Sequence, residues 1–231
     1  MNYLELCQRM RQECGISGTG PSTVVNQTGN LKRIVDWVNT AWIDIQTAHQ
    51  DWDWMRTSAS FPTVASQATY ALGTGTGTVG VSVATFGKWD RDTFRNYDTS
   101  VGTDSEVFMG FVHYDTWRDV YFYGALRTTT TRPIDMSITP AKAIALGPPP
   151  LVGYTITGDY FTAPLDMTAD ADIPALPAQF QMAIIYRAMM SYGAYEAAPE
   201  VYQRGELEFG KLMRRMTVDR IPETIWGGAL C

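Results

Sequence analysis

A glycine-rich segment near the start of the chain has the residue types of a phosphate-binding loop. Gly15 and Gly20 show the spacing of the two glycines in the motif GxxxxGKS/T. The lysine of that motif brings positive charge to the β- and γ-phosphates, but Pro21 stands at its position here. The segment also follows a helical pattern, whereas the phosphate loop follows a strand. We therefore expect a loop between helices, and no nucleotide site.

Three Asp-x-Asp pairs have the residue types of a metal or glycosidase site, because paired carboxylates can bind cations or act on glycosides. None is followed by the glycine and glutamate of a calcium loop, and acidic pairs in loops are commonly solvated. We expect no metal site at any of them. The pairs are Asp51/Asp53, Asp90/Asp92 and Asp170/Asp172.

The two histidines, His49 and His113, belong to no metal-binding or catalytic motif. The sequence contains neither HExxH nor HxH, and it lacks the GxSxG elbow of many hydrolases. We expect His49 to be packed near the end of a helix, while the sequence alone leaves a Ser-His-Asp site at His113 open. The search for chemistry thus predicts that the protein is not an enzyme and has no cofactor.

The cysteines and the first residues of the chain indicate a protein that is made in a reducing cytosol and is not secreted. Cys7, Cys14 and Cys231 are odd in number and form no CxxC pair, so neither a disulfide framework nor a zinc site is expected. Cys7 and Cys14 would share one helix face as small buried residues. Charged residues run through residues 1–15, which excludes a signal peptide, and no segment reaches the ~20 apolar residues of a membrane span.

The charge balance argues against direct binding of nucleic acid. The 231 residues include 18 basic and 24 acidic side chains, a net charge of −6. An acidic protein does not bind DNA by neutralising phosphates. It could still surround DNA without gripping it, because like charge keeps a polyanion from sticking.

Helical periodicity marks both ends of the chain. Residues 2–14 and 31–50 each carry one apolar stripe, with Asn30 as a possible N-cap of the second helix. Similar spacing over residues 180–197 and 202–216 predicts two more helices, although Gly205 and Gly210 weaken the last one. Residues 217–231 show no helical period.

The middle of the chain, residues 56–168, is rich in Thr, Val, Gly, Tyr and Phe, the composition of short strands. Residues 89–104 are polar and predict a long loop in part, and the prolines at 148–150 predict a stiff extended stretch. The candidate strands are residues 57–64, 69–72, 77–84, 106–112, 119–123, 136–139 and 153–162.

The order of these patterns predicts an α+β fold, in which the N- and C-terminal helices form one bundle and a sandwich- or barrel-like β region is inserted. Neither helical pair could bury its stripe alone, so the two pairs are expected to pack together. We predict N-terminal helices at residues 1–55, the β-rich insertion at 56–168, C-terminal helices at 169–216 and a tail at 217–231.

Two regions of the sequence resemble the head–tail connector (neck) adaptor proteins of tailed bacteriophages. Residues 4–56 have the short helix, Gly/Pro loop and long Trp-containing helix ending in a W-x-W knot that recur there. Residues 154–165 (YTITGDYFTAPL), residues 172–177 (DIPALP) and a helix containing Tyr186, Arg187 and Ala188 are similar too. Together the two regions cover roughly half of the chain.

The resemblance implies a structural virion protein of the neck, made in the host cytoplasm and monomeric when alone. Such adaptors form a ring, commonly of twelve subunits, beneath the portal protein. The ring extends the DNA channel, through which DNA passes without specific binding, and it docks the tail or nozzle proteins. No membrane is involved. The inserted β region would face outward and hold tail or fibre proteins.

By the same analogy, residues 217–231 would be an arm that contacts the portal, with Trp226 as its anchor, since buried Trp is a frequent hot-spot residue. A frayed terminus is the alternative. The adjacent Arg214 and Arg215 could meet a helix C-terminus or pair with an acidic partner. The candidate partner-docking residues are Arg214, Arg215, Ile221, Pro222, Ile225 and Trp226.

Three other functions remain open at this point. The chain could be another virion component, such as a tail-tube or baseplate subunit. Its aromatic β region could form a carbohydrate-binding module. An enzyme is the last alternative, and loss of activity on changing His113 or an Asp pair would indicate it.

Overall fold

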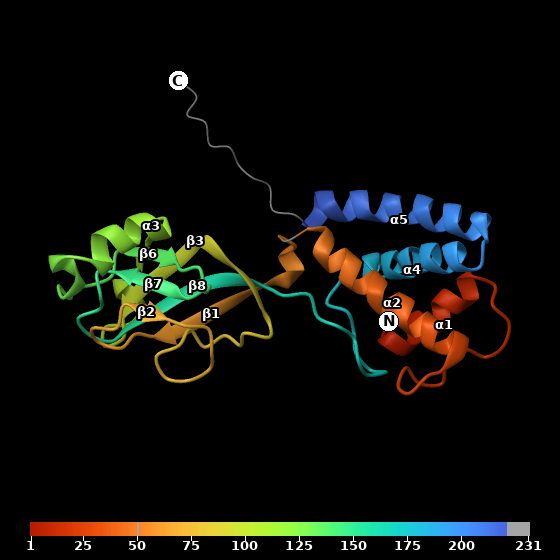
Figure 1. Cartoon of the computed structure of the whole chain (residues 1–231), viewed down its shortest axis with the longest axis horizontal. Helices are drawn as coiled ribbons and strands as arrows, with labels where there is room; N and C mark the ends of the chain where they lie inside the picture. Colours follow the sequence, from red (N-terminus) through yellow and green to blue (C-terminus); the bar gives the residue numbers. More distant parts are fainter. Residues whose placement is uncertain (50, 221–231) are drawn as a thin grey trace, which may run out of the picture. The chain divides into compact units, whose positions relative to one another are not determined.

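The computed structural model describes residues 1–49 and 51–220, and it has two compact units. The helical unit joins Met1–Met55 to Pro164–Cys231, and the β unit is Arg56–Ala163 (Figure 1). The α+β fold with a β-rich insertion is therefore confirmed. In the described part of the chain, no helix is long and apolar enough to cross a membrane.

Four long helices build the helical unit. They are α1 (Tyr3–Glu13), α2 (Gly29–Ala48), α4 (Met182–Tyr195) and α5 (Pro199–Arg220), with short 3-10 turns η1 (Asp53–Met55) and η5 (Ala178–Phe180). A capping box begins α1, in which the Asn2 side chain accepts from the Glu5 backbone N–H at 2.8 Å. Asn30 is not the N-cap of α2 as predicted, because the helix begins two residues earlier than residue 31, at Gly29, with Thr28 as its N-cap.

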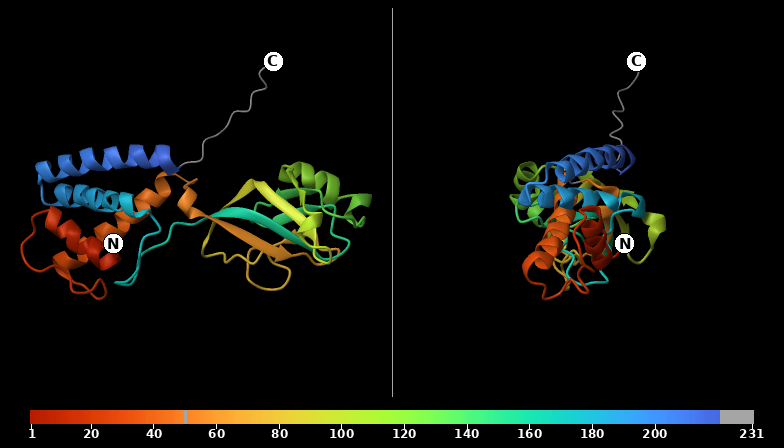
Figure 2. Two further views of the ribbon diagram at one scale, coloured as in Figure 1. Left: turned by 180° about the vertical axis from the view of Figure 1, so that it is seen from behind. Right: turned by 90° about the vertical axis from the view of Figure 1, so that its right-hand side faces the viewer.

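The core of the helical unit lies where α4 meets α1 and α2. The predicted stripes face inward here, so Leu6 of α1, Ile45 of α2 and Ile184 of α4 are all completely buried. In addition, the Tyr3 hydroxyl donates a hydrogen bond to the Val35 carbonyl at 2.9 Å and so connects α1 to α2. In both views of Figure 2, α4 lies between α5 and the α1–α2 pair.

Two glycines allow α4 and α5 to approach closely. A Cβ added to Gly193 would lie 2.8 Å from the Tyr202 nitrogen, and one added to Gly205 would lie 2.8 Å from the Tyr186 carbonyl oxygen. Gly205 therefore does not simply weaken the last helix, since it makes the packing of that helix possible. The helix is also longer than its apolar period suggests, because residues 217–220 continue it.

Two four-stranded sheets form the β unit. One sheet has the order β1-β8-β3-β4 and the other the order β2-β7-β6-β5. All pairs are antiparallel except β5 with β6. The strands are β1 (Arg56–Pro62), β2 (Thr69–Tyr70), β3 (Phe86–Asp98), β4 (Val107–Phe108), β5 (Gly110–Phe111), β6 (Asp135–Ile138), β7 (Ile144–Gly147) and β8 (Tyr154–Thr162).

Both sheets contribute to one apolar cluster, which makes the unit a sandwich. Phe61, Phe94 and Ile156 come from the first sheet, and Met136 and Leu146 from the second. Between β5 and β6 the chain makes a helical excursion of α3 (Tyr114–Trp117), η3 (Arg118–Phe122) and η4 (Ala125–Arg127). Trp117 is buried and anchors this excursion.

Three sequence predictions for the β unit were wrong, and one strand was missed. Residues 89–104 are no long loop, because most of them belong to β3. Residues 119–123 form helical turns in place of a strand, and residues 77–84 make only isolated bridges. Strand β7, at Ile144–Gly147, was not predicted at all.

Candidate docking surfaces on the helical unit

Helix α5 leaves most of its surface uncovered. Of its 22 residues only Gly205 and Met216 are buried. On the opposite side, Leu207 is 58% exposed and Val218 is 84% exposed, the largest value among the large apolar side chains described. Because α5 packs on one side only, its other side is available for contact with a partner.

Two adjacent arginines near the end of α5 have no partner among the residues that the structure describes. Its other basic residues are engaged: Arg204 with Glu13 at 2.6 Å, Lys211 with Glu208 at 2.6 Å, and Arg220 with Asp53 at 3.3 Å. Arg214 and Arg215 are both exposed and make no ion pair, hydrogen bond or ring contact with the residues that the structure describes. They are therefore free to bind a carboxylate, for which the guanidinium is well shaped.

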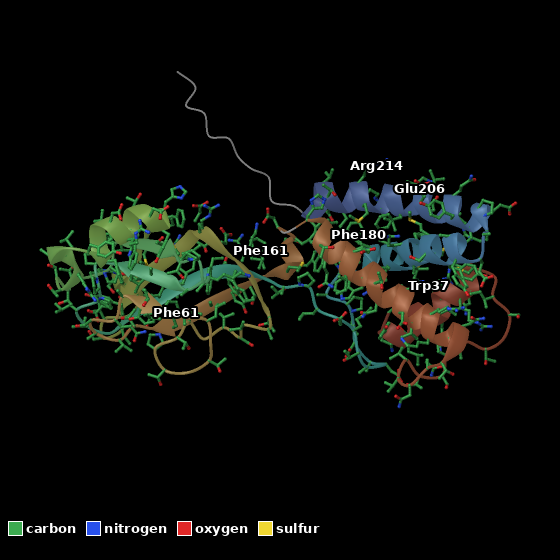
Figure 3. All side chains as sticks on the ribbon, viewed as in Figure 1. Trp37, Phe61, Phe161, Phe180, Glu206 and Arg214 are labelled. Carbon is green, nitrogen blue, oxygen red and sulfur yellow. The ribbon has the colours of Figure 1, made fainter. Side chains whose placement is uncertain are left out.

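These arginines line an open hollow of about 540 Å³ between the end of α5 and the residues just before α4. Asp219 also lines it but is already engaged, since it accepts from Gln179 Nε2 at 3.3 Å and lies 3.1 Å from Arg220 Nε. The charge left available in the hollow is positive. Figure 3 marks Arg214 on α5 and Phe180 of the opposite wall. The lining residues are Gln179, Phe180, Arg214, Arg215, Val218 and Asp219.

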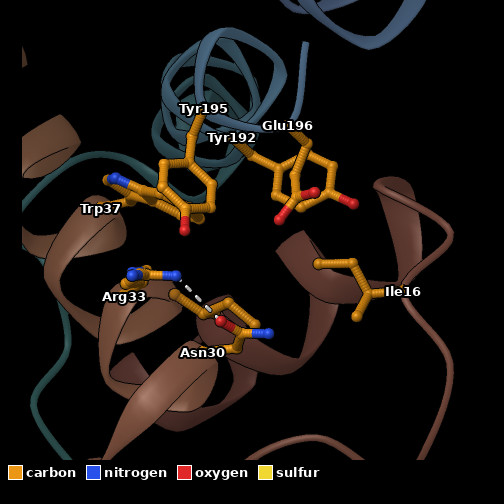
Figure 4. Close-up of a pocket in the computed structure, with 8 residues that line it drawn as sticks. Ile16, Asn30, Arg33, Trp37, Tyr192, Tyr195 and Glu196 are labelled. Carbon is orange, nitrogen blue, oxygen red and sulfur yellow. Dashed lines mark hydrogen bonds between the residues drawn. The ribbon is translucent and has the colours of Figure 1, made fainter. Parts of the chain in front are cut away.

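A second, smaller pocket of about 130 Å³ lies at the other end of the bundle, near the start of α5 (Figure 4). The Trp37 ring centroid lies 5.6 Å from that of Tyr195 and 6.0 Å from that of Tyr192. Arg33 stacks on Tyr195, with Cζ 4.4 Å from its centroid, and donates to Asn30 Oδ1 at 3.0 Å. The pocket is thus aromatic, and Arg33, the one cation among its described lining residues, is already held in place.

The glycine-rich loop after α1 is held together by side chains of its own unit. Arg11 is buried and donates to the Gly18 carbonyl. From the other side, Asp170 accepts from the Val24 backbone N–H at 2.5 Å and from Thr23 Oγ1 at 3.0 Å. The loop's polar contacts are internal, which is the arrangement of a structural loop.

The acidic pairs also take structural contacts. Asp53 pairs with Arg220, and Asp90 pairs with Arg56 at 3.0 Å. Asp172 Oδ2 accepts from the backbone N–H groups of residues 168 and 169, and these hydrogen bonds lower the pKa of that carboxyl. Among the residues described, no three His, Cys, Asp or Glu side chains gather as metal ligands would.

The two histidines and the described cysteines, Cys7 and Cys14, lie within the folded units. His49 follows the last residue of α2 and meets the Trp52 ring edge-on at 4.8 Å, while His113 precedes α3 and meets Phe111 at 5.6 Å. Cys7 and Cys14 are free thiols, and burial is the main cause that raises the pKa of each to about 12. Thiols held protonated in this way are poor nucleophiles.

A comparison with known protein families identifies the family of the chain. Residues 1–225 match the family model described as SU10 adaptor protein. The chain belongs to this family. It is a family of phage head–tail adaptors, so the protein is a structural adaptor and a component of the bacteriophage virion. No curated protein matches the chain.

The adaptor's predicted docking residues divide into two groups. Arg214 and Arg215 lie together on the exposed side of α5, at the hollow. Ile221, Pro222, Ile225 and Trp226 lie outside the residues that the structure describes. The sequence reasoning missed the pocket around Trp37, although a signal existed: Trp37 is a large aromatic residue off the apolar stripe of α2.

Proposed function

We propose that this phage adaptor forms a ring beneath the portal, extends the DNA channel and docks the tail or nozzle proteins. The observation that carries the proposal is the family match, which runs through both units and reaches residue 225. A ring requires two different patches that fit each other, because only a heterologous contact repeats around an axis. Twelve copies would match the usual copy number of such rings.

The end of α5 and the residues after it are proposed as the portal-docking arm. Arg214, Arg215 and the exposed Val218 stand immediately before residues 221–231, which contain Ile221, Pro222, Ile225 and Trp226. Two guanidinium groups that have no partner among the described residues, beside apolar side chains, provide both the charge and the anchor of a typical interface hot spot. This supports a contact with an acidic and apolar site on the portal.

The net charge fits a role beside DNA in which DNA is not bound. At −6, the subunit repels a polyanion overall. A channel built from such subunits lets the genome pass without holding it. The net charge therefore favours passage of DNA through the channel over binding of its bases or phosphates.

The β unit is proposed to face tail or fibre proteins. Six large apolar side chains are exposed within residues 107–126, which is a high density for a soluble domain and typical of an interaction site. They are Val107, Phe108, Val120, Phe122, Tyr123 and Leu126. The aromatic members would also suit a glycan, so the isolated protein should be tested on a glycan array as the alternative.

Electron microscopy of the adaptor mixed with the portal encoded beside it tests the proposal. We expect a ring added at one end of the portal with matching symmetry. The variant Arg214→Ala/Arg215→Ala should weaken this binding, whereas Arg204→Ala/Lys211→Ala, which removes the same charge from paired positions of α5, should not. An intact portal that gains no ring would overturn the proposal.

A further inference from the structure

The hollow at the end of α5 combines positive charge that no described residue neutralises with an exposed apolar rim, and this combination points to a specific occupant. Its two cations, Arg214 and Arg215, are exposed and have no partner among the described residues, while its carboxylate, Asp219, is held by Gln179 and Arg220. Phe180 is buried in its wall, whereas Val218 is 84% exposed at its rim. An occupant that satisfies this surface must combine a carboxylate with apolar side chains.

The last eleven residues of the sequence have this composition. Residues 221–231 contain one acidic residue, Glu223, and no basic residue. Most of the remainder is apolar, with Ile225 and Trp226 directly after Thr224. Their charge is opposite to the one left free in the hollow, and their side chains suit its apolar rim.

The chain length allows this segment to reach the hollow of its own subunit. Three extended residues span about 10 Å from Arg220 to Glu223, since each residue adds ~3.3–3.6 Å. The helix rise from Arg220 back to Arg215 is only about 7.5 Å, at 1.5 Å per residue. Glu223 can therefore turn back onto the arginines without disturbing α5.

The aromatic pocket at the other end of the bundle is too far away for residues 221–231 of the same subunit to reach. That pocket is lined by Glu196, three residues before the start of α5, and α5 with its 22 residues is ~33 Å long. Trp226 stands six residues beyond Arg220 and reaches ~20 Å at most. Within one subunit, Trp226 can meet the hollow but not the pocket at Trp37.

We infer that in the free subunit residues 221–231 dock on the hollow of the same chain. The Glu223 carboxylate accepts hydrogen bonds from the guanidinium groups of Arg214 and Arg215, and Trp226 packs beside Val218 and Phe180. When the subunit binds the portal, the segment leaves the hollow. Docking in the free subunit therefore keeps residues 221–231 from contacting other proteins until a portal is present. This last step rests on the proposed portal contact, whereas docking in the free subunit does not.

The test uses the full chain labelled with 5-fluorotryptophan and observed by fluorine NMR without portal. The Trp226 signal is assigned by its loss in Trp226→Phe, and a synthetic peptide of residues 221–231 gives the undocked reference position. We expect the Trp226 signal away from the peptide position at every protein concentration. It should move to the peptide position in Arg214→Ala/Arg215→Ala and in Glu223→Gln, and stay in the control Lys211→Ala.

Three results would overturn the inference: a signal at the peptide position in the unmodified chain, a displaced signal that the arginine variant leaves unchanged, or a displacement that disappears on dilution, which would mean docking between copies. Failure of the proposed function can be distinguished from failure of this inference. A chain that docks its own segment but adds no ring to the portal contradicts only the portal contact. A chain that binds the portal with a free Trp226 signal contradicts only the inference.

Discussion

Gly205 of α5 lies so close to Tyr186 of α4 that a methyl group on Gly205 would stand 2.8 Å from the Tyr186 carbonyl oxygen and 3.1 Å from Met190 Cγ. A backbone oxygen cannot move away as the end of a flexible side chain can. Gly205→Ala should therefore push the two helices apart. We expect a loss of about 1–3 kcal/mol in the free energy of unfolding, the usual cost of overpacking, measured by urea denaturation followed by circular dichroism.

Gly210 provides the matched control for this substitution, because it lies on the same helix with nothing within 4 Å of an added Cβ. Gly210→Ala should raise the free energy of unfolding by about 0.5–1 kcal/mol, since alanine is the better helix former. If both alanine variants shifted stability in the same direction, the close contact at Gly205 would not be what determines the packing of α5 on α4.

A second prediction concerns Asn96, which is completely buried in the β unit. Its Nδ2 donates to the Pro133 carbonyl at 2.8 Å, and its Oδ1 accepts from Arg132 Nε at 2.6 Å. Asn96→Leu removes both side-chain hydrogen bonds and leaves the Pro133 carbonyl and Arg132 Nε without this partner. We expect a loss of about 2–3 kcal/mol in the free energy of unfolding, measured in urea.

Arg95→Ala on the same strand is the control for Asn96. It breaks the pair between Arg95 and Glu106 at 3.2 Å, in which the arginine side chain is 55% exposed. Exposed pairs of this kind contribute less than about 1 kcal/mol. Equal losses for the two variants would show that the buried hydrogen bonds of Asn96 add nothing beyond a surface contact.

The acid dependence of stability provides a third prediction, at Asp172. The backbone N–H groups of Ala169 and Thr168 hold the pKa of this carboxyl below its usual range. A carboxyl with a lowered folded pKa stabilises the fold above its unfolded pKa of ~3.9, and that contribution is lost as the pH falls through the folded pKa. Asp172→Asn should be less stable than the unmodified chain at pH 7, and the difference should shrink below pH ~4.

Urea denaturation across this pH range measures the effect. Asp92→Asn is the control, because Asp92 is exposed and accepts no hydrogen bond from the described residues. At pH 7 it should cost less stability than Asp172→Asn, because it removes no hydrogen bond among the described residues. A constant gap between Asp172→Asn and the unmodified chain from pH 7 down to pH 3 would contradict the assignment.

The sequence predicted the elements whose burial follows a regular period. In α2 the apolar stripe contains Ile34, Val38 and Ile45, which are all buried, so a period of 3.6 was visible. Strand β3 was not predicted, because its pairing with β8 shifts register between Asp90 and Arg95. This shift destroys the alternation of buried and exposed residues.

Other features depend on tertiary contacts that no local pattern encodes. Residues 119–123 have strand-forming side chains, but they continue a helix that the buried Trp117 anchors. The close approach at Gly205 was invisible for the same reason, and local propensity pointed the wrong way. At the candidate site, the sequence identified Arg214 and Arg215 as a tight basic pair, but only the structure shows that every other basic residue of α5 is engaged.

The last prediction is that the helical unit folds and binds the portal without the β unit. The two units have separate cores, and Arg56 pairs with Phe161 across β1 and β8, so the chain enters and leaves the β unit at neighbouring points. Residues 56–163 can therefore be replaced by a short Gly/Ser linker. We expect this variant to show the helical circular dichroism of the remaining helices and to add a ring to the portal.

Particles assembled with the shortened adaptor should lack tail or fibre proteins, because the exposed side chains of residues 107–126 are lost with the β unit. A second variant tests the surface without the deletion: the full chain with Phe122→Ser/Tyr123→Ser keeps the sandwich but removes two exposed aromatic side chains. It should reduce attachment of the same proteins while leaving the ring intact. Fully tailed particles from the shortened adaptor would contradict a docking role for the β unit, because the helical unit alone would then be sufficient for every contact of the neck.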